Sequence, residues 1–208
     1  MPVSCVLHLP DGTDVALVGD TAYREILDDR PYLVSASSFF QVNTLQAEVL
    51  LAQVRQYLDL DQSDVLLDVY CGVGTLGLSM ADQVARVIGI EASPSAIQDA
   101  RINAEDNPAV TLIEGPAERV MNQIGDRVTK IVIDPPRQGC KPEVIEALLN
   151  LAPQRLAYVS CDPTTFARDA RALVEGGYTL HEVLAIDMFP QTHHIEVVSL
   201  WLRAGSPT

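Results

Sequence analysis

The chain has 208 residues, of which 48% are hydrophobic and 20% charged, and its formal net charge is −14. This length suits one domain with at most a small appendage, and the composition is that of an ordinary globular protein. No apolar run could span a bilayer and the N-terminal residues do not resemble a signal peptide, so we expect a cytoplasmic protein with no membrane partner. Taken alone, the negative charge disfavours nucleic acid as a partner.

Four cysteines, Cys5, Cys71, Cys140 and Cys161, are widely separated and form no CxxC motif. The spacing therefore predicts neither a disulfide framework nor a zinc site. For a cysteine in a reducing compartment the usual role is that of a small buried hydrophobic residue. We expect that role for the first three.

The first 35 residues carry turn-forming Pro, Gly and Asp between short apolar runs, a pattern that predicts strands. The expected strands are Val3–Leu9, Asp14–Val18, Tyr23–Leu27 and Tyr32–Ser35. A helix from Thr44 to about Leu58 follows, because its apolar residues recur with a 3.6-residue period.

After Ser63 strands and helices alternate, which predicts a parallel sheet covered on both faces. The expected strands are Val65–Tyr70, Val87–Glu91, Val110–Ile113, Lys130–Asp134, Arg155–Ser160, Thr179–Asp187 and Ile195–Leu202, and the helices lie near 75–84, 94–106, 116–124, 142–151 and 164–175. The last two strands are separated only by Met188–His194, too short for a parallel crossover, so the final strand should run antiparallel. This layout resembles the S-adenosylmethionine-dependent methyltransferase fold, which is Rossmann-like, with a seven-stranded, mostly parallel sheet.

A glycine-rich segment follows the first strand of this sheet and contains GxGxxG at Gly72, Gly74 and Gly77. Such a triplet is weak evidence for NAD, and a turn needed only for packing is the structural alternative. Asp68 at the end of the strand and the glycine loop resemble the first methyltransferase motif more closely. Glu91 ends the next strand, where its carboxylate could accept both ribose hydroxyls of either cofactor. We therefore expect a nucleoside cofactor, with S-adenosylmethionine favoured over NAD.

The tetrapeptide Asp134-Pro135-Pro136-Arg137 closes the fourth strand. Ligands bind outside the carboxyl ends of strands in an open α/β sheet, so the tetrapeptide should face the cofactor. The two prolines stiffen the turn that holds Asp134. Amino-methylating enzymes of this fold carry an aromatic residue where Arg137 stands, and a plain rigid turn is the alternative interpretation.

Cys161 ends the fifth strand, directly before a helix whose N-cap is Asp162. A helix N-terminus stabilises a thiolate, whereas acidic neighbours oppose it. Glu196 opens a very apolar strand, where a carboxylate is costly unless paired or protonated, and burial would raise its pKa towards neutrality. A solvent-facing Glu196 is the alternative. His193 and His194 could be solvated loop residues, a metal pair or residues that orient Glu196, and metal is the least favoured because no third ligand is evident.

Four motifs resemble the RNA uracil-C5 (5-methyluridine) methyltransferase family, in the family's order. They cover roughly Tyr23 to Leu202, and they are Ser38–Asn43, Asp134–Gly139, Ser160–Pro163 with its trailing Ala167–Asp169, and Asp187–Glu196. The resemblance implies methylation of uridine C5 in structured RNA, either tRNA or rRNA, with S-adenosylmethionine as methyl donor. Cys161 would add to C6 of uracil, and Glu196 would remove the C5 proton.

The resemblance also assigns binding roles by position in the motifs. The cofactor would be bound by Gln41, Tyr70, Gly72, Gly74, Thr75, Glu91 and Asp134, and the target base by Gln41, Asp134 and Arg137. His194 would have an orienting role.

The family's usual architecture places a β-barrel RNA-binding domain and a central domain before the catalytic one. By that comparison, residues 1–36 are the remnant of a small β-rich central domain and residues 37–208 the catalytic domain. An RNA-binding part that is absent from this chain would reconcile RNA as substrate with the acidic charge. The alternatives are a methyltransferase of the same fold acting on a small molecule or protein, and a cofactor-binding domain that is inactive without its RNA-binding domain.

Overall fold

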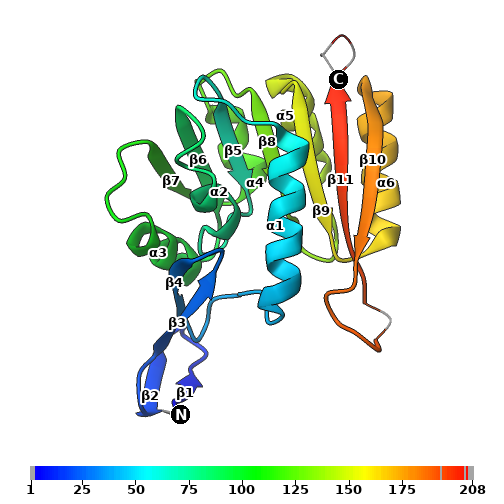
Figure 1. Ribbon diagram of the computed structural model, residues 1–208. Coiled ribbons are helices and arrows are strands. Elements are labelled where there is room, and N and C mark those ends of the chain that lie inside the picture. The colour runs from blue at the N-terminus through cyan, green and yellow to red at the C-terminus, as the bar shows by residue number, and fades with distance from the viewer. Residues whose placement is uncertain (1–2, 193, 204, 206–208) are drawn as a thin grey trace.

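The computed structural model describes residues 3–192, 194–203 and 205, and its centre is a seven-stranded sheet with the order β10-β11-β9-β8-β5-β6-β7 (Figure 1). The strands of this sheet are β5 (Val65–Val69), β6 (Arg86–Glu91), β7 (Val110–Glu114), β8 (Lys130–Ile133), β9 (Arg155–Ser160), β10 (Tyr178–Ile186) and β11 (Glu196–Arg203). In the part of the chain that the structure describes, no helix has the length and apolarity needed to cross a membrane.

Only β11 runs against the direction of the other strands in this sheet. The pairs β5–β6, β6–β7, β5–β8 and β8–β9 are parallel, whereas β11 is antiparallel to both β9 and β10. The sequence prediction of a mostly parallel sheet with an antiparallel last strand is therefore confirmed. The strand order reverses at β5, which has β8 on one side and β6 on the other, so a ligand site is expected at the carboxyl ends of these strands.

Helices cover both faces of the sheet. They are α1 (Thr44–Leu58), α2 (Thr75–Ser79) and α3 (Pro94–Asn103), and then α4 (Ala117–Val120), the 3₁₀ turn Met121–Gln123, α5 (Pro142–Leu151) and α6 (Pro163–Glu175). The first three share one hydrophobic core cluster and the others share a second cluster, one on each face. Double coverage explains why the inner strands carry apolar runs, such as residues 131–133 of the fully buried β8.

Two antiparallel hairpins precede α1: β1 (Cys5–His8) with β2 (Asp14–Val18), and β3 (Ala22–Leu27) with β4 (Arg30–Ser35). Figure 1 shows them below the green end of the sheet, with β1 and β2 furthest from it. Asn103 of α3 ties β4 to the sheet domain, because its Oδ1 accepts the Leu33 N–H at 2.7 Å and its Nδ2 donates to the Leu33 carbonyl at 3.0 Å.

Helix α2 is shorter than its sequence predicts, ending at Ser79 rather than near residue 84. Two arginines from distant elements bind carbonyl groups at its C-terminal end. Arg30 Nη1 donates to the Leu78 carbonyl at 3.2 Å, and Arg55 Nη2 donates to the Ser79 carbonyl at 2.7 Å. These tertiary contacts satisfy carbonyls that a longer helix would have used internally, and no local pattern reveals them.

Candidate active site

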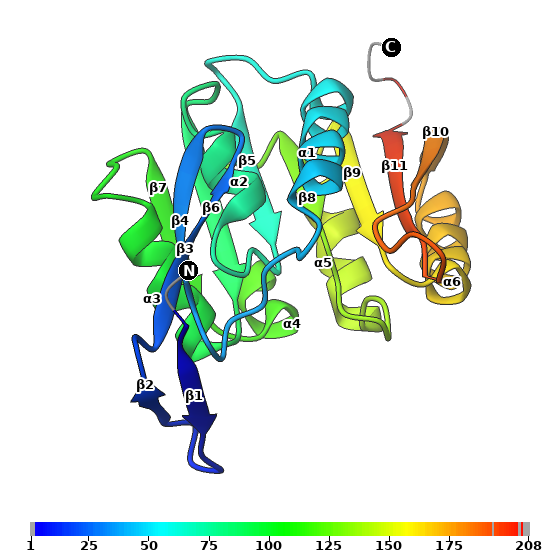
Figure 2. The same cartoon turned by 60° about the horizontal axis from the view of Figure 1, so that its bottom comes forward.

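The residues proposed for cofactor and catalysis converge on one edge of the sheet. Asp68 lies near the end of β5, Glu91 ends β6, Asp134 follows β8 and Cys161 follows β9. Glu196 begins β11, and because that strand is antiparallel its first residue lies at the same edge. Figure 2, which brings this edge forward, shows the segment between β4 and α1 crossing beside it.

Glu91 is fixed by backbone donors from two loops. Its Oε2 accepts the Gly72 N–H at 3.0 Å and its Oε1 accepts the Ser93 N–H at 2.7 Å. Gly72 and Gly74 have left-handed backbones, with φ of 56° and 92°, which glycine adopts without steric cost. A Cβ on Gly74 would also lie 2.5 Å from Leu78 Cδ1. The glycine loop and the carboxylate thus form one preformed unit.

Asp68 is 1% exposed, and only one of its carboxylate oxygens is bonded. Its Oδ2 accepts the Gly77 N–H at 2.7 Å, whereas Oδ1 is buried without a hydrogen-bond partner among the described residues. Burial raises the pKa of Asp68 to about 7, and the nearby Asp134 and Glu91 act in the same direction. An unbonded buried carboxylate oxygen beside a glycine loop suits a cationic ligand group, such as the ammonium of S-adenosylmethionine.

Tyr70 has a left-handed backbone, with φ of 66°, which is uncommon for an aromatic residue and frequent at binding sites. Its side chain lines a cavity of about 430 Å³ together with Ala92, Pro116 and Pro136. Burial raises the pKa of the Tyr70 phenol, which therefore stays neutral. The cavity opens directly after Glu91, where a planar ring attached to a ribose would be placed.

Cys161 and Glu196 come together through the register of β9 and β11. Val197 pairs with Ser160 in this antiparallel ladder, so the next position along places Glu196 opposite Cys161. Glu196 is 4% exposed, which overturns the solvent-facing alternative, and Cys161 is half-buried. A thiol and a carboxyl from strands distant in sequence thus face each other at the end of the sheet.

The electrostatic environment links these groups to Asp134 and Arg137. Burial raises the pKa of Glu196 to about 7, with Asp134 raising it further and Arg137 opposing the shift. Burial also raises the pKa of the Cys161 thiol, as do Glu196 and Asp134, while Arg137 lowers it. The pKa of the half-buried Asp134 rises to about 6 for the same reason of burial. The pKa of Cys161 is therefore raised even though the thiol precedes a helix N-terminus, and the exposed Arg137 is a cation that favours the thiolate.

Gln41 lies in a segment that is anchored on both sides. Ser38 Oγ donates to Asp99 Oδ2 of α3 at 2.6 Å, and Asn43 Nδ2 donates to the Met188 carbonyl at 3.1 Å. The anchors place this segment between the cofactor strands and the loop that leads to Glu196. Sequence reasoning missed the role of Asp99, although a buried aspartate on an otherwise apolar helix face was a usable signal.

Of the remaining predicted site residues, Thr75 begins α2, and its carbonyl accepts the Tyr32 hydroxyl at 3.3 Å. The His194 ring stacks edge-on against Phe189, with centroids 6.1 Å apart, and His193 lies outside the described residues. No group of three metal-ligating side chains occurs within the described ranges.

Three cysteines were expected to be buried, and two are. Burial raises the pKa of Cys140 to about 12 and that of Cys71 well above its usual value, so both thiols are inert. The prediction for Cys5 is wrong, because it is exposed on the outer hairpin, where β1 has no covering layer.

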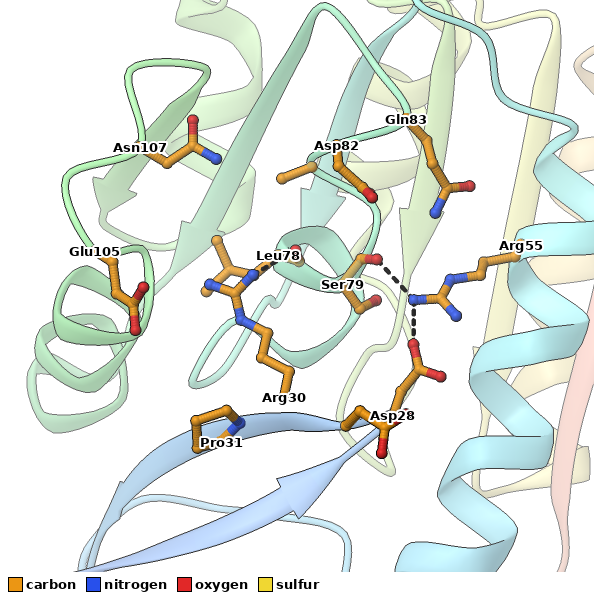
Figure 3. Close-up of a pocket in the computed structure, with 12 residues that line it drawn as sticks. Asp28, Arg30, Pro31, Arg55, Leu78, Ser79, Asp82, Gln83, Glu105 and Asn107 are labelled. Carbon is orange, nitrogen blue, oxygen red and sulfur yellow. Dashed lines mark hydrogen bonds and ion pairs between the residues drawn. The ribbon is translucent and has the colours of Figure 1, made fainter.

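A larger cavity of about 590 Å³ lies away from this edge, between the β3–β4 turn, α1 and the end of α2 (Figure 3). Its two arginines are engaged: Arg55 pairs with Asp28, and Arg30 binds the Leu78 carbonyl. The cavity therefore marks the junction between hairpin and sheet domain, without the nucleophile and carboxylates that gather at the strand ends.

The sheet topology and the site at its edge define an S-adenosylmethionine-dependent methyltransferase fold. A family model described as tRNA (Uracil-5-)-methyltransferase matches residues 25–204, and the chain belongs to this family. An uncharacterised RNA methyltransferase of Oceanobacillus iheyensis is 42% identical over 188 residues, which is 88% of this chain and 41% of the relative. One from Caldanaerobacter subterraneus is 40% identical over 192 residues, or 90% of this chain and 42% of the relative. The chain thus spans about two fifths of the length of these curated relatives.

Among solved structures, the tRNA (uracil-54, C5)-methyltransferase of Pyrococcus abyssi in complex with S-adenosyl-L-homocysteine is 37% identical, with a TM-score of 0.76. The similarity covers 88% of this chain and 45% of that one. A precorrin 8w decarboxylase from Methanobacterium thermoautotrophicum, 21% identical with a TM-score of 0.68 over 86% of this chain and 99% of that one, shares the fold alone.

Proposed function

We propose that this chain is the catalytic part of an enzyme that methylates C5 of uridine in structured RNA, tRNA or rRNA. The observation that carries the proposal is the position of Cys161 opposite Glu196 across β9 and β11, beside the Glu91 carboxylate that the Gly72 N–H holds. Membership of the tRNA (uracil-5-)-methyltransferase family supports the reaction type.

When bound, S-adenosylmethionine supplies the methyl group as a sulfonium electrophile. Glu91 would hold its ribose, Asp68 its ammonium, and Tyr70 with the adjoining cavity its base, while Gln41, Gly72, Gly74 and Thr75 would complete the site. Asp134 lies between this site and Cys161, where it could contact both cofactor and uracil. The backbone bonds to Glu91, the unbonded Asp68 Oδ1 and the cavity beside Tyr70 support the roles of these three residues.

The chemical steps assign one role to each of the facing groups. The Cys161 thiolate would add to C6 of uracil, and the C5=C6 electron pair would then give an enolate whose C5 takes the methyl group. The S–CH₃ bond would break as the C5–CH₃ bond forms, leaving S-adenosylhomocysteine as the thioether product. The carboxylate of Glu196 then takes the C5 proton, the double bond re-forms and the thiolate leaves. Glu196 suits this task because burial raises its pKa to about 7, so the group exchanges protons near neutral pH. Arg137 would stabilise the thiolate and hold the base or an adjoining phosphate.

We further propose that residues 1–36 are the remaining part of a small β-rich domain and that an RNA-binding part lies outside this chain. The net charge of −14 supports a separate basic surface, because RNA affinity depends on neutralising phosphates. The catalytic edge itself would then act on a base that is delivered to it.

The test is incubation with S-adenosylmethionine and tRNA or rRNA fragments that contain 5-fluorouridine. Fluorine replaces the C5 proton, so the thiolate cannot be eliminated and a covalent adduct should accumulate on Cys161. Uridine-containing RNA should yield 5-methyluridine on nucleoside analysis. Methyl transfer to a small molecule or protein, or cofactor binding with neither adduct nor 5-methyluridine, would overturn the proposal.

A further inference from the structure

The loop that carries Arg137 is tied to α6 by Thr165 and Arg168, and Arg168 also lines the cavity beside Tyr70. Thr165 Oγ1 donates to the Arg137 carbonyl at 3.1 Å. Arg168 Nη2 donates to the carbonyls of Gln138 and Cys140 at 2.9 and 3.0 Å. The backbone of the loop is thus held from Arg137 to Cys140 by two side chains of one helix.

Asp169 is the centre of this arrangement and is 2% exposed. Its Oδ2 accepts the Cys140 N–H and the Tyr158 hydroxyl, both at 2.7 Å, and its Oδ1 accepts Arg168 Nε at 2.9 Å. A buried carboxylate is stable when it is paired and hydrogen-bonded in this way, and losing one partner is costly. Both oxygens are occupied, so Asp169 is suited to holding geometry.

Gly139 shows how close the loop and helix are. Its φ is +72°, and a Cβ built on it would lie 2.6 Å from both Arg168 Nη2 and Asp169 Oδ2. Only glycine allows this backbone conformation and this approach together. The contact between loop and helix therefore depends on Gly139 in the loop and on Thr165, Arg168 and Asp169 in α6. It leaves little freedom for the loop to move.

The same helix begins at the nucleophile. Asp162, next to Cys161, is the N-cap of α6 and accepts the N–H groups of Thr164 and Thr165 at 2.8 and 2.9 Å. The first two turns of α6 thus fix the chain at Cys161 and also the loop at Arg137. The backbone at Cys161 and the backbone at Arg137 are therefore both held by one helix.

We propose that Asp169 is a positioning residue, which acts through Arg168 and the Cys140 backbone to hold the Arg137 guanidinium beside Cys161 and Glu196. This inference rests on the proposed function, because the reaction needs a thiolate at Cys161. The groups that face this thiol are Glu196 from β11, Asp134 after β8 and Arg137 from the loop. Arg137 is the cation among them, so its displacement would disfavour the thiolate.

Asp169→Asn tests the proposal, since it keeps the shape but puts an NH₂ group against an N–H donor. The readout is the rate of iodoacetamide alkylation at Cys161 across a pH series, measured by peptide mass spectrometry, which separates it from the exposed Cys5. We expect alkylation about three-fold to ten-fold slower near neutral pH, with a higher apparent thiol pKa. If the substitution only removed the negative charge of Asp169 and left Arg137 in place, the pKa of the Cys161 thiol would fall and alkylation would be faster. Unchanged or faster alkylation therefore overturns the proposal.

A double-mutant cycle with Arg137→Gln identifies the route. Arg137→Gln alone should slow alkylation, and Asp169→Asn in that background should add less than about a two-fold change. Additive slowing by the two substitutions would show that Asp169 acts by another route and would contradict the inference.

Two further variants guard against simple loss of folding. Thr165→Val removes the bond from Oγ1 to the Arg137 carbonyl, together with a longer bond to the Asp162 carbonyl at 3.2 Å within α6's own N-terminus. It should slow alkylation in the same direction by a smaller factor, even if Asp169→Asn proves unfolded. Arg171→Gln, on the same helix in an exposed pair with Glu175, removes a cation without touching the loop and should leave alkylation unchanged. None of these measurements needs RNA, so their failure is distinguishable from failure of the fluorouridine adduct.

Discussion

The two halves of the strand-end site use carboxylates in different ways. At β5 and β6, backbone N–H groups hold the carboxylates: Glu91 is bonded by Gly72 and Ser93, and Asp68 by Gly77. At β8, β9 and β11, ionisable side chains face one another, and Asp134, Cys161 and Glu196 all have raised pKa values. The pKa of Asp68 is also raised, to about 7, so the two halves differ in how their carboxylates are held. On the proposed function, the first half would bind the cofactor with a fixed geometry and the second would exchange protons.

The largest expected effect comes from removing the nucleophile. Cys161→Ala should lower methyl transfer by at least about a thousand-fold, because no other group supplies the addition to C6. Cofactor affinity, measured by calorimetry with S-adenosylhomocysteine, should stay within about two-fold, since the binding half is untouched. The control is Cys5→Ala, an exposed thiol far from the site. Methylation by Cys161→Ala near the wild-type rate would contradict the role of Cys161 as the nucleophile.

Glu196→Gln should reduce turnover by about a hundred-fold or more, because the C5 proton then has no positioned base. In the unmodified chain, the rate should rise with pH through about 7, as Glu196 must be deprotonated to accept the proton. The rate at which free 5-methyluridine forms over multiple turnovers, measured at several pH values, checks both expectations. Glu182→Gln, the same change at an exposed site on β10, should have no effect. A rate that does not rise with pH through about 7 would contradict the role of Glu196 as the base.

Glu91→Gln should weaken cofactor binding by about ten-fold, since an amide accepts the Gly72 and Ser93 N–H groups poorly and binds ribose hydroxyls less strongly. The matched control is Glu114→Gln, at the paired position on β7, where the side chain is exposed. Calorimetric titration compares the two variants. Equal affinities for both would show that β6 does not hold the ribose.

The smallest effect concerns stability. The pKa of Glu196 is raised by folding from 4.5 to about 7, so the folded state binds its proton more tightly. Its contribution is fully present below about pH 4.5 and is lost as pH rises through 7. The free energy of unfolding in urea should therefore fall by an amount on the order of 1 kcal/mol between pH 5 and 8 from this group. Glu196→Gln should flatten that slope, and an identical slope in the variant would contradict the assignment.

The sheet could be predicted from sequence because its signals are local. Apolar runs alternating with helices gave the parallel strands, and the short segment after Met188 required β11 to be antiparallel. The end of α2 could not be predicted, because Arg30 and Arg55 from other elements bind its last carbonyls. The prediction that Cys5 is buried is also wrong, because a strand pattern does not reveal whether another layer covers the strand.

The sequence predicts which residues of the candidate site lie at strand ends. It does not predict the strand register or the long-range hydrogen bonds that hold these residues in place. Glu91 and Asp134 stand at strand ends that any α/β sheet brings together. The register that sets Glu196 opposite Cys161 depends on pairing between strands far apart in sequence. The contacts of Asp99 with Ser38, and of Asp169 with the loop at Cys140, are long-range hydrogen bonds that leave no periodic signal.

The most direct test of the paired roles is the reaction of Glu196→Gln with ordinary uridine-containing RNA and S-adenosylmethionine. If Cys161 adds first and Glu196 acts last, the variant should stop after methyl transfer. Digestion and mass spectrometry should then find a methylated nucleotide attached to the peptide that contains Cys161, and Cys161→Ala in the same background should lose it. Free 5-methyluridine formed at the wild-type rate, or an adduct on another residue, would contradict the account.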